Sequence, residues 1–468
     1  MIMNVQPCRY NPLARNAFVV VLLTVMSLVN AGAAWAVDLK VGSFCIDATP
    51  PVGSPLCFAL VPPSTGANDP LTARGVVFAP AGELPIVLVA VDWVGISNDA
   101  QDAWRQAIAE ACKTTADRVA VHTLHQHDAP GCDFLAGEIA AAAGLEGEHF
   151  NVRHARDVIA RTAEAAAAAL ADPQPVTHLG YGAGKVEKVA SNRRILGPSG
   201  QVEFQRMSSS VNKAMQEMPE GVIDPLARVV SFWQGDKPLV ALTYYTTHPQ
   251  SYYRTGKTSA DFVGMARGAR EVALRGTRHI HFNGCSGNVA AGKYNDGSPA
   301  MRPILANRLA NGLRSAWEAT EKAPIEEVEL DWSSTQVNLP PGEWLVPAEL
   351  EATLQNRDAP KIDQLQAART LAFLQRCEAG SGITLSRLRI GKVDLLHLPG
   401  ELFVEYQLAA QNLHPERFLC TAAYGDYGPG YIGLSESYAQ GGYETSQGSR
   451  VSPRVEKVLM DAIAELVE

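Results

Sequence analysis

The chain has 468 residues, of which 19% are charged, and its formal net charge at pH 7 is -9. An acidic chain without clustered Lys and Arg does not match a nucleic-acid-binding protein, because phosphate binding requires grouped cations. The length allows one large domain or two fused ones.

The first 36 residues have the pattern of a secretory signal peptide. Arg9 and Arg15 precede the apolar stretch 17–29, and small residues follow up to the Ala-Trp-Ala run at 34–36. A short positive region, a short apolar core and an A-x-A site are the features of a cleaved export signal. The apolar stretch is shorter than the roughly 20 residues of a spanning helix, and no later stretch is long enough. We therefore expect a mature chain, residues 37–468, that is secreted or periplasmic and has no transmembrane segment.

Short β-branched runs alternate with helical patterns along residues 37–468. The runs predict strands at 73–79, 84–91, 118–122, 229–233, 239–245 and 279–282. The helical patterns lie at 100–111, 150–171, 262–274, 304–320 and 451–467. This alternation predicts an α/β fold, with a mixed central β-sheet flanked by helices in a single large domain. Residues 340–383 are Pro-rich at first and then charged and helical, so we expect a helical excursion or lid there.

A cluster of histidines stands at the end of the predicted strand 118–122. His122, His125, His127 and Asp128 fall within seven residues, in a chain with 11 histidines. His125 and His127 are two residues apart, so in extended chain both side chains face the same side. His122 falls on the opposite face by parity and is better placed in the core or behind the ligands. Because zinc prefers neutral imidazole ligands, the run predicts a metal site.

Three later segments also carry residues that a packed core does not favour. His248 ends the predicted strand 239–245 and is followed by a proline, and Ser286 and Asn288 lie in a small-residue loop that suits an oxyanion site. Glu401 follows a Pro-Gly turn and precedes a segment rich in Tyr and Gly, 424–443. Each also has a purely structural explanation, namely a hydrogen-bonded histidine, a tight turn and a helix-capping acid. Strand ends at one edge of an α/β sheet converge on ligands, which favours a shared site.

Together these motifs resemble the neutral (alkaline, non-lysosomal) ceramidase family. Its H-T-H-S-G-P segment is similar to residues 125–130, His-Gln-His-Asp-Ala-Pro, with three departures. The further family motifs follow in the same order: an Asn-Arg pair at 192–193, a His-Pro strand end at 248–249, an S-x-D element at 259–261, a small-residue loop at 287–289, a P-G-E turn at 399–401, an E-x-Y element at 436–438 and a Tyr-Glu pair at 443–444. No single motif is decisive, but the shared order is fairly specific.

The resemblance implies a zinc ion bound by His125, His248, Glu401 and Tyr438, with Tyr431 and Tyr443 as alternatives for the tyrosine. It also implies that His127 and Arg193 contact the substrate or the oxyanion. We expect His127 or Asp128 to shuttle the proton, and Arg193 and loop N–H groups near Ser286 and Asn288 to hold the oxyanion.

Two departures from the family bear on the chemistry. Ala290 stands where the alignment places the family's active-site serine, so either Ser286 or a metal-activated water is the nucleophile. We prefer water, because zinc lowers the pKa of its bound water to roughly 7. The family's C-terminal β-sandwich is expected to be absent, because the chain stops soon after Tyr443. The substrate is then a small or lipid-like molecule that need not be ceramide.

The sequence thus predicts an exported zinc-dependent hydrolase that cleaves an amide (N-acyl) or ester bond by metal-activated water. One alternative is a non-catalytic zinc- or ligand-binding protein on the same scaffold, which Ala290 favours. The other is an unrelated metallo-amidohydrolase barrel, in which the His-x-His pair would lie near the start of the mature chain.

Overall fold

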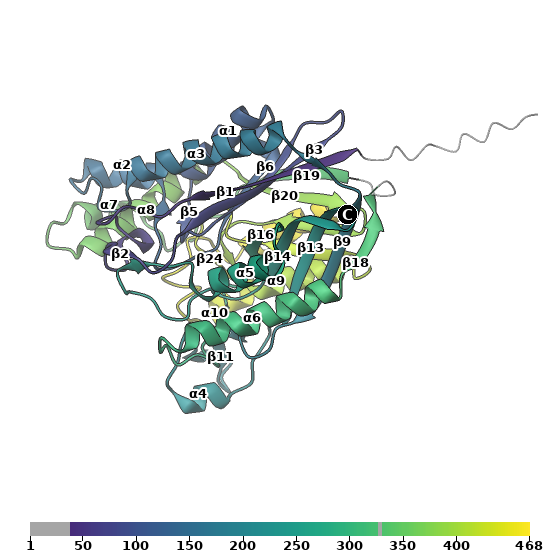
Figure 1. The fold of residues 1–468 in the computed structure, drawn as a ribbon. Helices are drawn as coiled ribbons and strands as arrows, with labels where there is room; N and C mark the ends of the chain where they lie inside the picture. The colour runs from purple at the N-terminus through teal and green to yellow at the C-terminus, as the bar shows by residue number, and fades with distance from the viewer. Residues whose placement is uncertain (1–37, 326–329) are drawn as a thin grey trace, which may run out of the picture. The chain divides into compact units, whose positions relative to one another are not determined.

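The six predicted strands all lie in two five-stranded sheets, and a four-stranded sheet accompanies them. The computed structural model describes residues 38–325 and 330–468. The predicted signal peptide lies outside the described residues and stays a prediction. The described chain is α/β, as the alternation of strands and helices predicts (Figure 1).

The first sheet has the strand order β6-β4-β3-β1-β8. Its strands are β1 (Leu39–Asp47), β3 (Thr72–Pro80), β4 (Ile86–Val91), β6 (Val119–Thr123) and β8 (Gln174–Pro175). Helices α1 (Asp99–Cys112) and α3 (Val152–Ala171) cover its outer face (Figure 1). Because β4 is covered on both faces, it is buried at every position, which explains its continuous apolar run.

The second sheet packs its inner face against the first. Its order is β16-β14-β13-β9-β18, and its strands are β9 (His178–Lys185), β13 (Leu226–Gln234), β14 (Lys237–Tyr245), β16 (Arg278–Asn283) and β18 (Glu321–Pro324). The rings of Phe78 on β3 and Phe232 on β13 meet edge to face at 5.1 Å between the two sheets. Helices α5 (Asp261–Ala273) and α6 (Met301–Glu318) cover the outer face (Figure 1). The two sheets therefore lie between two helical layers.

The third sheet joins the other two at their carboxyl ends. Its strands are β19 (Leu330–Val337), β20 (Ile383–Ile390), β21 (Val393–His397) and β23 (Phe418–Ala422). Helices α9 (Val404–Leu413) and α11 (Val455–Val467) pack on it. The amide of Ala423, just after β23, donates to the carbonyl of Asn283 at the end of β16. Each sheet contains one parallel pair, β4 with β6, β14 with β16, and β21 with β23, so the loops that follow these strands converge.

The segment 340–383 carries two helices. Helices α7 (Pro347–Gln355) and α8 (Lys361–Glu378) pack against each other, and α8 lies on α2 (Phe134–Ala142). Leu365 and Leu371 of α8 share a buried apolar cluster with Ala140 of α2. The segment is therefore fixed to the body of the protein through α2.

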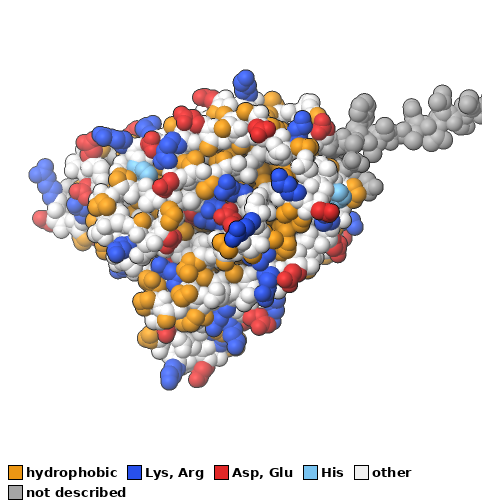
Figure 2. Space-filling view, viewed as in Figure 1, with side chains coloured by type: hydrophobic (Ala, Val, Ile, Leu, Met, Phe, Trp, Pro, Cys, Tyr) orange, Lys and Arg blue, Asp and Glu red, His pale blue; other side chains and the backbone are white. Residues whose placement is uncertain are grey.

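The visible surface carries mixed charge. On the face seen in Figure 2, basic and acidic side chains are interspersed, with apolar side chains between them. Among the described helices, none combines the length and the apolar character that crossing a membrane requires.

Buried histidines give the fold a dependence on pH that can be measured. Burial lowers the pKa of His281 from 6.5 to about 3, so the imidazole stays neutral in the folded protein where the unfolded chain binds a proton. Its contribution to stability is complete above pH 6.5 and is lost as the pH falls towards the folded pKa. Asp133 and Asp261 act in the opposite sense, because burial raises their pKa values to about 7 and about 6. The contribution of His281 must therefore be isolated by substitution.

We expect the wild type to lose about 2 kcal/mol more unfolding free energy than His281→Asn between pH 7.5 and pH 5. Urea unfolding at both pH values measures this difference. His414→Gln, at a partly exposed histidine, serves as the control and should retain the wild-type pH dependence. Equal pH dependence in the wild type and His281→Asn would contradict the prediction.

Candidate metal centre

Three strand ends, one from each sheet, bring a metal-binding set together. His125 follows β6, His248 follows β14, and Glu401 follows β21 in the short strand β22 (Glu401–Leu402). One ligand atom of each side chain lies within 4.8 Å of the others, and all three residues are buried. Gly287 lets its loop approach Glu401, because a Cβ at this position would lie 2.2 Å from the Glu401 carbonyl oxygen.

His125 does not lie in extended chain, which corrects the geometric reasoning that pairs it with His127. Strand β6 ends at Thr123, and His125 has a φ of 62°, in the left-handed region that few non-glycine residues adopt. Its carbonyl accepts a hydrogen bond of 2.5 Å from Gln250 Nε2, which holds this conformation. Strained backbone of this kind is typical of functional sites, where surrounding structure over-determines it.

The backbone sets the tautomers of both histidines. Nδ1 of His125 lies 2.8 Å from the Val94 carbonyl oxygen, and Nδ1 of His248 lies 2.7 Å from that of Ser286. Because a carbonyl can only accept, each Nδ1 carries the proton and each Nε2 presents a lone pair. Both Nε2 atoms face Glu401 Oε2, at 3.3 Å from His125 and 3.1 Å from His248. Acceptor atoms that face one another in a buried site are unfavourable unless a proton or a cation lies between them, so this arrangement can hold a metal ion.

The protonation states suit zinc. Burial lowers the pKa of His125 to about 4, so its imidazole is neutral near pH 7. Burial raises the pKa of Glu401, but His125, His248 and the hydrogen bond from Tyr427 outweigh this effect and hold the pKa well below its ordinary value. Two neutral imidazoles and one carboxylate form a donor set that zinc uses in catalytic sites, where a further position stays open. The residues present therefore fit a zinc ion.

His127 lies between this cluster and the surface. Its Nε2 is 3.1 Å from Nε2 of His125, and its ring meets the partly exposed ring of Tyr253 at 4.7 Å. Burial and the neighbouring His125 and His248 lower its pKa well below the usual value. A neutral imidazole in this place can accept a proton from a group at the cluster.

Arg193 supplies a buried positive charge on the other side of His248. Its Nη1 lies 3.4 Å from His248 Nε2 and donates to the Tyr431 hydroxyl at 3.1 Å. Burial lowers the pKa of Arg193, but Tyr431 and Glu444 together raise it above its ordinary value, so the guanidinium stays charged. Its position suits the stabilisation of an oxyanion.

The tyrosine of the predicted ligand set needs correction. The Tyr438 hydroxyl bonds Ser449 Oγ at 3.1 Å and its ring lies against Trp344, away from the histidines. The Tyr431 hydroxyl lies 3.2 Å from His248 Nε2. The resemblance to the family assigns Tyr438 to the site from its position in the sequence. In the structure the turn at 427–431 brings Tyr431 to His248 instead.

We expect Tyr431→Phe to weaken zinc binding about tenfold or more, in the range reported for groups that support metal ligands. Tyr438→Phe is the matched control and should bind zinc as the wild type does. Competition with a fluorescent zinc chelator gives both affinities. Equal affinities in the two variants would assign Tyr431 a purely structural role.

Two further predicted catalytic residues have structural contacts. The Asp128 carboxylate accepts hydrogen bonds from the Arg254 amide at 2.9 Å and the Thr255 hydroxyl at 2.8 Å, so it anchors a loop. The Asn288 side chain accepts from the Val404 amide and donates to Glu405, which fixes the start of α9. Within the described residues, neither side chain has a hydrogen bond to His125, His248 or Glu401, and the catalytic roles of both residues stay predictions.

Ser286 and Ala290 lie in the loop that supports His248. The Ser286 hydroxyl is fully buried and bonds the Tyr424 hydroxyl at 2.7 Å, while its carbonyl orients His248. Ala290 is fully buried in the short strand β17 (Val289–Ala290), which pairs with β10 (Ser191–Asn192). The Ser286 carbonyl therefore positions His248, and its hydroxyl has Tyr424 as its partner.

Sequence reasoning missed two residues beside the cluster. The Tyr427 hydroxyl donates to Glu401 Oε1 at 2.5 Å, and Gln250 holds the His125 backbone. Tyr427 belongs to the Tyr- and Gly-rich segment 424–443, but nothing in its spacing distinguishes it from the other tyrosines. Gln250 follows His248-Pro249 directly, and only this proximity hints at a shared role.

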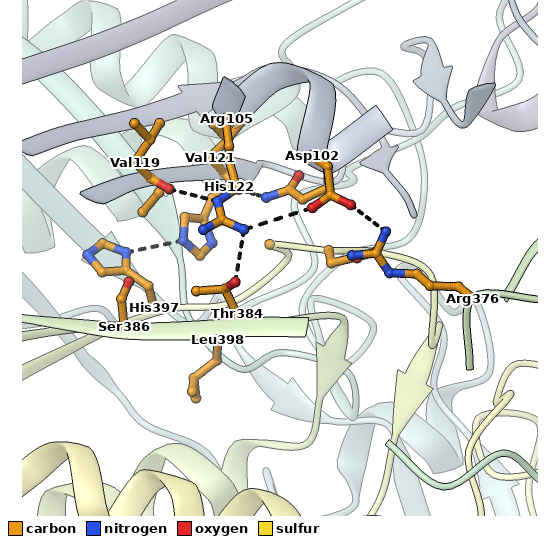
Figure 3. A pocket seen from close by; sticks show the side chains of 14 residues that line it. Asp102, Arg105, Val119, Val121, His122, Arg376, Thr384, Ser386, His397 and Leu398 are labelled. Atoms are coloured by element: carbon orange, nitrogen blue, oxygen red, sulfur yellow. Dashed lines mark hydrogen bonds and ion pairs between the residues drawn. The ribbon is translucent and has the colours of Figure 1, made fainter. Parts of the chain in front are cut away.

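His122, on β6, lies apart from the cluster. Its Nε2 is 3.1 Å from Nδ1 of His397, in a small polar cavity between α1 and the third sheet (Figure 3). Arg105 and Arg376 line the same cavity, whose volume is about 20 Å³. This is the space of one or two water molecules, so the cavity cannot hold a substrate.

The fold and the buried His-His-Glu cluster together define an α/β protein with a candidate metal centre. Among solved structures, the chain is similar to a ceramidase complexed with C2, with a TM-score of 0.66 and 18% identity over 92% of this chain and 75% of that one. It is also similar to neutral ceramidase from Pseudomonas aeruginosa, with a TM-score of 0.65 and 18% identity over 92% of this chain and 74% of that one. No protein-family model and no curated protein matches the sequence. The resemblance to neutral ceramidases is therefore confirmed at the level of the fold.

Proposed function

We propose that the protein is a zinc-dependent hydrolase that cleaves an amide (N-acyl) or ester bond. The observation that carries the proposal is the buried set of acceptor atoms on His125, His248 and Glu401, which face one another. A bound cation would satisfy all three acceptors at once, which supports a metal at this place. The fold shared with neutral ceramidases supports the hydrolytic class.

Three residues of this chain would hold the ion, namely His125, His248 and Glu401, with Tyr431 beside them. When bound, zinc supplies Lewis acidity, which polarises a carbonyl and lowers the pKa of water to roughly 7. His127 accepts the proton of the attacking water at Nε2 and returns it to the leaving group. Nη1 of Arg193 stabilises the negative charge that develops on the carbonyl oxygen.

The surroundings of the cluster support a small or lipid-like substrate. Tyr253 contacts His127, Met207 contacts Arg193, and Tyr443 contacts Tyr431. Tyr253, Met207 and Tyr443 are each more than one third exposed. Apolar side chains that link the catalytic groups to solvent suit an acyl chain, because its burial is favourable at this entrance.

Export is part of the proposal and rests on the N-terminal pattern of residues 1–36. N-terminal sequencing of the protein from the extracellular or periplasmic fraction should begin near Val37. Recovery of Met1 at the N-terminus of the exported protein would contradict cleavage.

The proposed function is tested by removing and restoring the metal. Purified protein is expected to contain about one zinc per chain by mass spectrometry of the metal, to lose N-acyl hydrolase activity on dialysis against a chelator, and to regain it with zinc. N-octanoyl amides and the matching octanoyl esters serve as substrates. Full activity in protein stripped of metal would refute the proposal.

A non-catalytic zinc-binding protein is the second candidate, and Ala290 in place of the family serine favours it. In that case the protein binds stoichiometric zinc and hydrolyses neither the amides nor the esters. The same measurement therefore distinguishes the two functions.

Replacing Ser286 by alanine tests which group is the nucleophile. We expect Ser286→Ala to keep activity within about tenfold of the wild type, because the hydroxyl is buried against Tyr424 and only the carbonyl orients His248. Steady-state kcat and the zinc content measure both roles. A loss comparable to that of a triad nucleophile, on the order of 10⁴-fold or more at unchanged zinc content, would make Ser286 the nucleophile.

A further inference from the structure

A second group of buried polar side chains lies next to the proposed metal centre. Arg369 on α8 places its guanidinium 3.8 Å from the ring centre of Phe58 and 5.5 Å from that of Tyr427. Tyr427 in turn donates to Glu401. A single aromatic ring therefore separates Arg369 from the metal-binding carboxylate.

Arg450 and His149 complete this group. Arg450 donates to the Gly428 carbonyl and the Thr370 hydroxyl, beneath the turn that carries Tyr427. His149 stacks on Phe58, with ring centres 5.1 Å apart. Arg369 and Arg450 both lower the pKa of His149 further than its burial alone does, so all three side chains share one environment. We call Arg369, Arg450 and His149 the donor cluster.

Two members of the donor cluster, Arg369 and His149, have nitrogen atoms without acceptors. Arg369 is 5% exposed, its Nε has no hydrogen-bond partner, and its one hydrogen bond is a long contact of 3.4 Å with Gln366. Both ring nitrogens of His149, which is 2% exposed, are also without partners. Within residues 38–325 and 330–468, neither arginine forms an ion pair with a carboxylate. Buried polar groups are nearly always paired, so the unpaired nitrogen atoms of Arg369 and His149 are expected to have a hydrogen-bond partner.

The nearest acid does not neutralise the cluster. Asp133 accepts hydrogen bonds from Asn98 Nδ2 at 2.9 Å and the Ala136 amide at 3.0 Å, where it caps α2. Burial raises its pKa to about 7, so it carries only part of a charge near neutral pH. Burial and Arg369 lower the pKa of Arg450 to about 10, in keeping with two cations that lack an anion between them.

The turn at 57–59, which carries Phe58, has an unusual backbone conformation. Cys57, Phe58 and Ala59 all have positive φ angles, of 49°, 55° and 67°. The turn is tied to the metal motif, because the Cys57 amide donates to the Ala129 carbonyl at 2.8 Å. Gly131 makes room for Phe58, since a Cβ there would lie 2.3 Å from the ring. Strain of this kind is kept where function requires it.

We propose that the donor cluster of Arg369, Arg450 and His149 binds an anionic group of the substrate, which makes the substrate an N-acyl amino acid or a similar carboxylate-bearing amide. A carboxylate offers planar acceptors that match guanidinium donors and supplies the missing negative charge. The inference rests on the proposed amide hydrolase and names its substrate class. The segment 340–383, through α8, then contributes to specificity.

The test compares a charged and a neutral substrate of equal size, N-octanoylglycine and N-octanoylglycinamide. In the zinc-loaded wild type we expect kcat/KM for N-octanoylglycine to exceed that for the amide by about tenfold or more, the usual worth of a buried charge-assisted hydrogen bond. Arg369→Met should abolish this preference by raising KM for N-octanoylglycine alone. Arg369→Lys, which keeps the charge, should retain part of it.

Arg156→Met is the matched control. Arg156 also stacks on a phenylalanine, 4.4 Å from the ring centre of Phe134, but it is exposed and lies outside the donor cluster. This variant should keep the wild-type preference. Arg450→Met replaces Arg369→Met if the latter does not fold, and it carries the same expectation.

Calorimetric binding of both compounds to the wild type and to Arg369→Met separates the two proposals. If neither compound is hydrolysed but N-octanoylglycine binds at least about tenfold more tightly, and Arg369→Met removes the difference, the hydrolase function fails and the anion site stands. If both compounds are hydrolysed and bound equally well by the wild type, the anion site is overturned and the hydrolase function stands.

Discussion

Replacing His248 by alanine is expected to remove stoichiometric zinc and to lower hydrolytic activity by more than about 100-fold. Loss of a group that merely supports a metal ligand already costs about 10- to 100-fold, and His248 presents its lone pair directly to the cluster. Without its imidazole the set falls to His125 and Glu401, one nitrogen and one carboxylate. Metal content by mass spectrometry and kcat/KM on N-octanoyl amides measure the two effects.

His122→Gln is the control for this substitution. His122 is also a buried histidine near a strand end, but it bonds His397 and the Ala423 carbonyl instead of the cluster. Its variant should keep zinc and activity. Zinc retained at full stoichiometry in both His125→Ala and His248→Ala would eliminate the proposed metal centre.

The second large effect is expected at Arg193. Arg193→Met should lower kcat by about 10²- to 10³-fold, the cost of removing one oxyanion-stabilising donor. Zinc content should stay near that of the wild type, because the guanidinium is not a metal ligand. Steady-state kinetics and metal analysis of the same preparation separate catalysis from metal loss.

Arg194→Met provides a neighbouring control. Both arginines contact Glu444, but Arg194 donates to the Ser437 carbonyl and Gln440, whereas only Arg193 reaches His248 and Tyr431. Activity of Arg194→Met within about tenfold of the wild type is expected. If the two variants lose activity equally, the effect of Arg193 is structural and operates through Glu444.

Local sequence patterns predicted helices and strands because the burial of one face gives a regular spacing of apolar residues along the chain. The continuous apolar run at 84–91 became β4, which is covered on both faces, and the amphipathic run at 150–171 became α3. The division of the strands among three sheets could not be predicted from the spacing of apolar residues. Strand pairing depends on contacts between distant segments, which a single sequence does not encode by local spacing.

The candidate site divides in the same way. His125, His248 and Glu401 could be predicted from the sequence, because each follows a buried strand and is a residue type that a core does not favour. The contacts of Tyr431 and Tyr427 could not be predicted, because the direction of a tyrosine side chain in a glycine-rich loop depends on the conformation of the turn. For Asp128 the sequence suggested chemistry from its place beside His127, and only the structure showed that its carboxylate also holds the loop at 254–255.

The sequence by itself determined the α/β class, the six strands and five helices predicted from local patterns, and the residue types that make a metal site chemically sensible. Only the tertiary structure decided which atoms meet. It set the tautomers of His125 and His248 through the Val94 and Ser286 carbonyls, and it brought Arg369 from α8 to within one ring of Glu401. Periodicity reports which face of an element is buried, whereas the meeting of side chains from separate sheets follows from the packing of the whole chain.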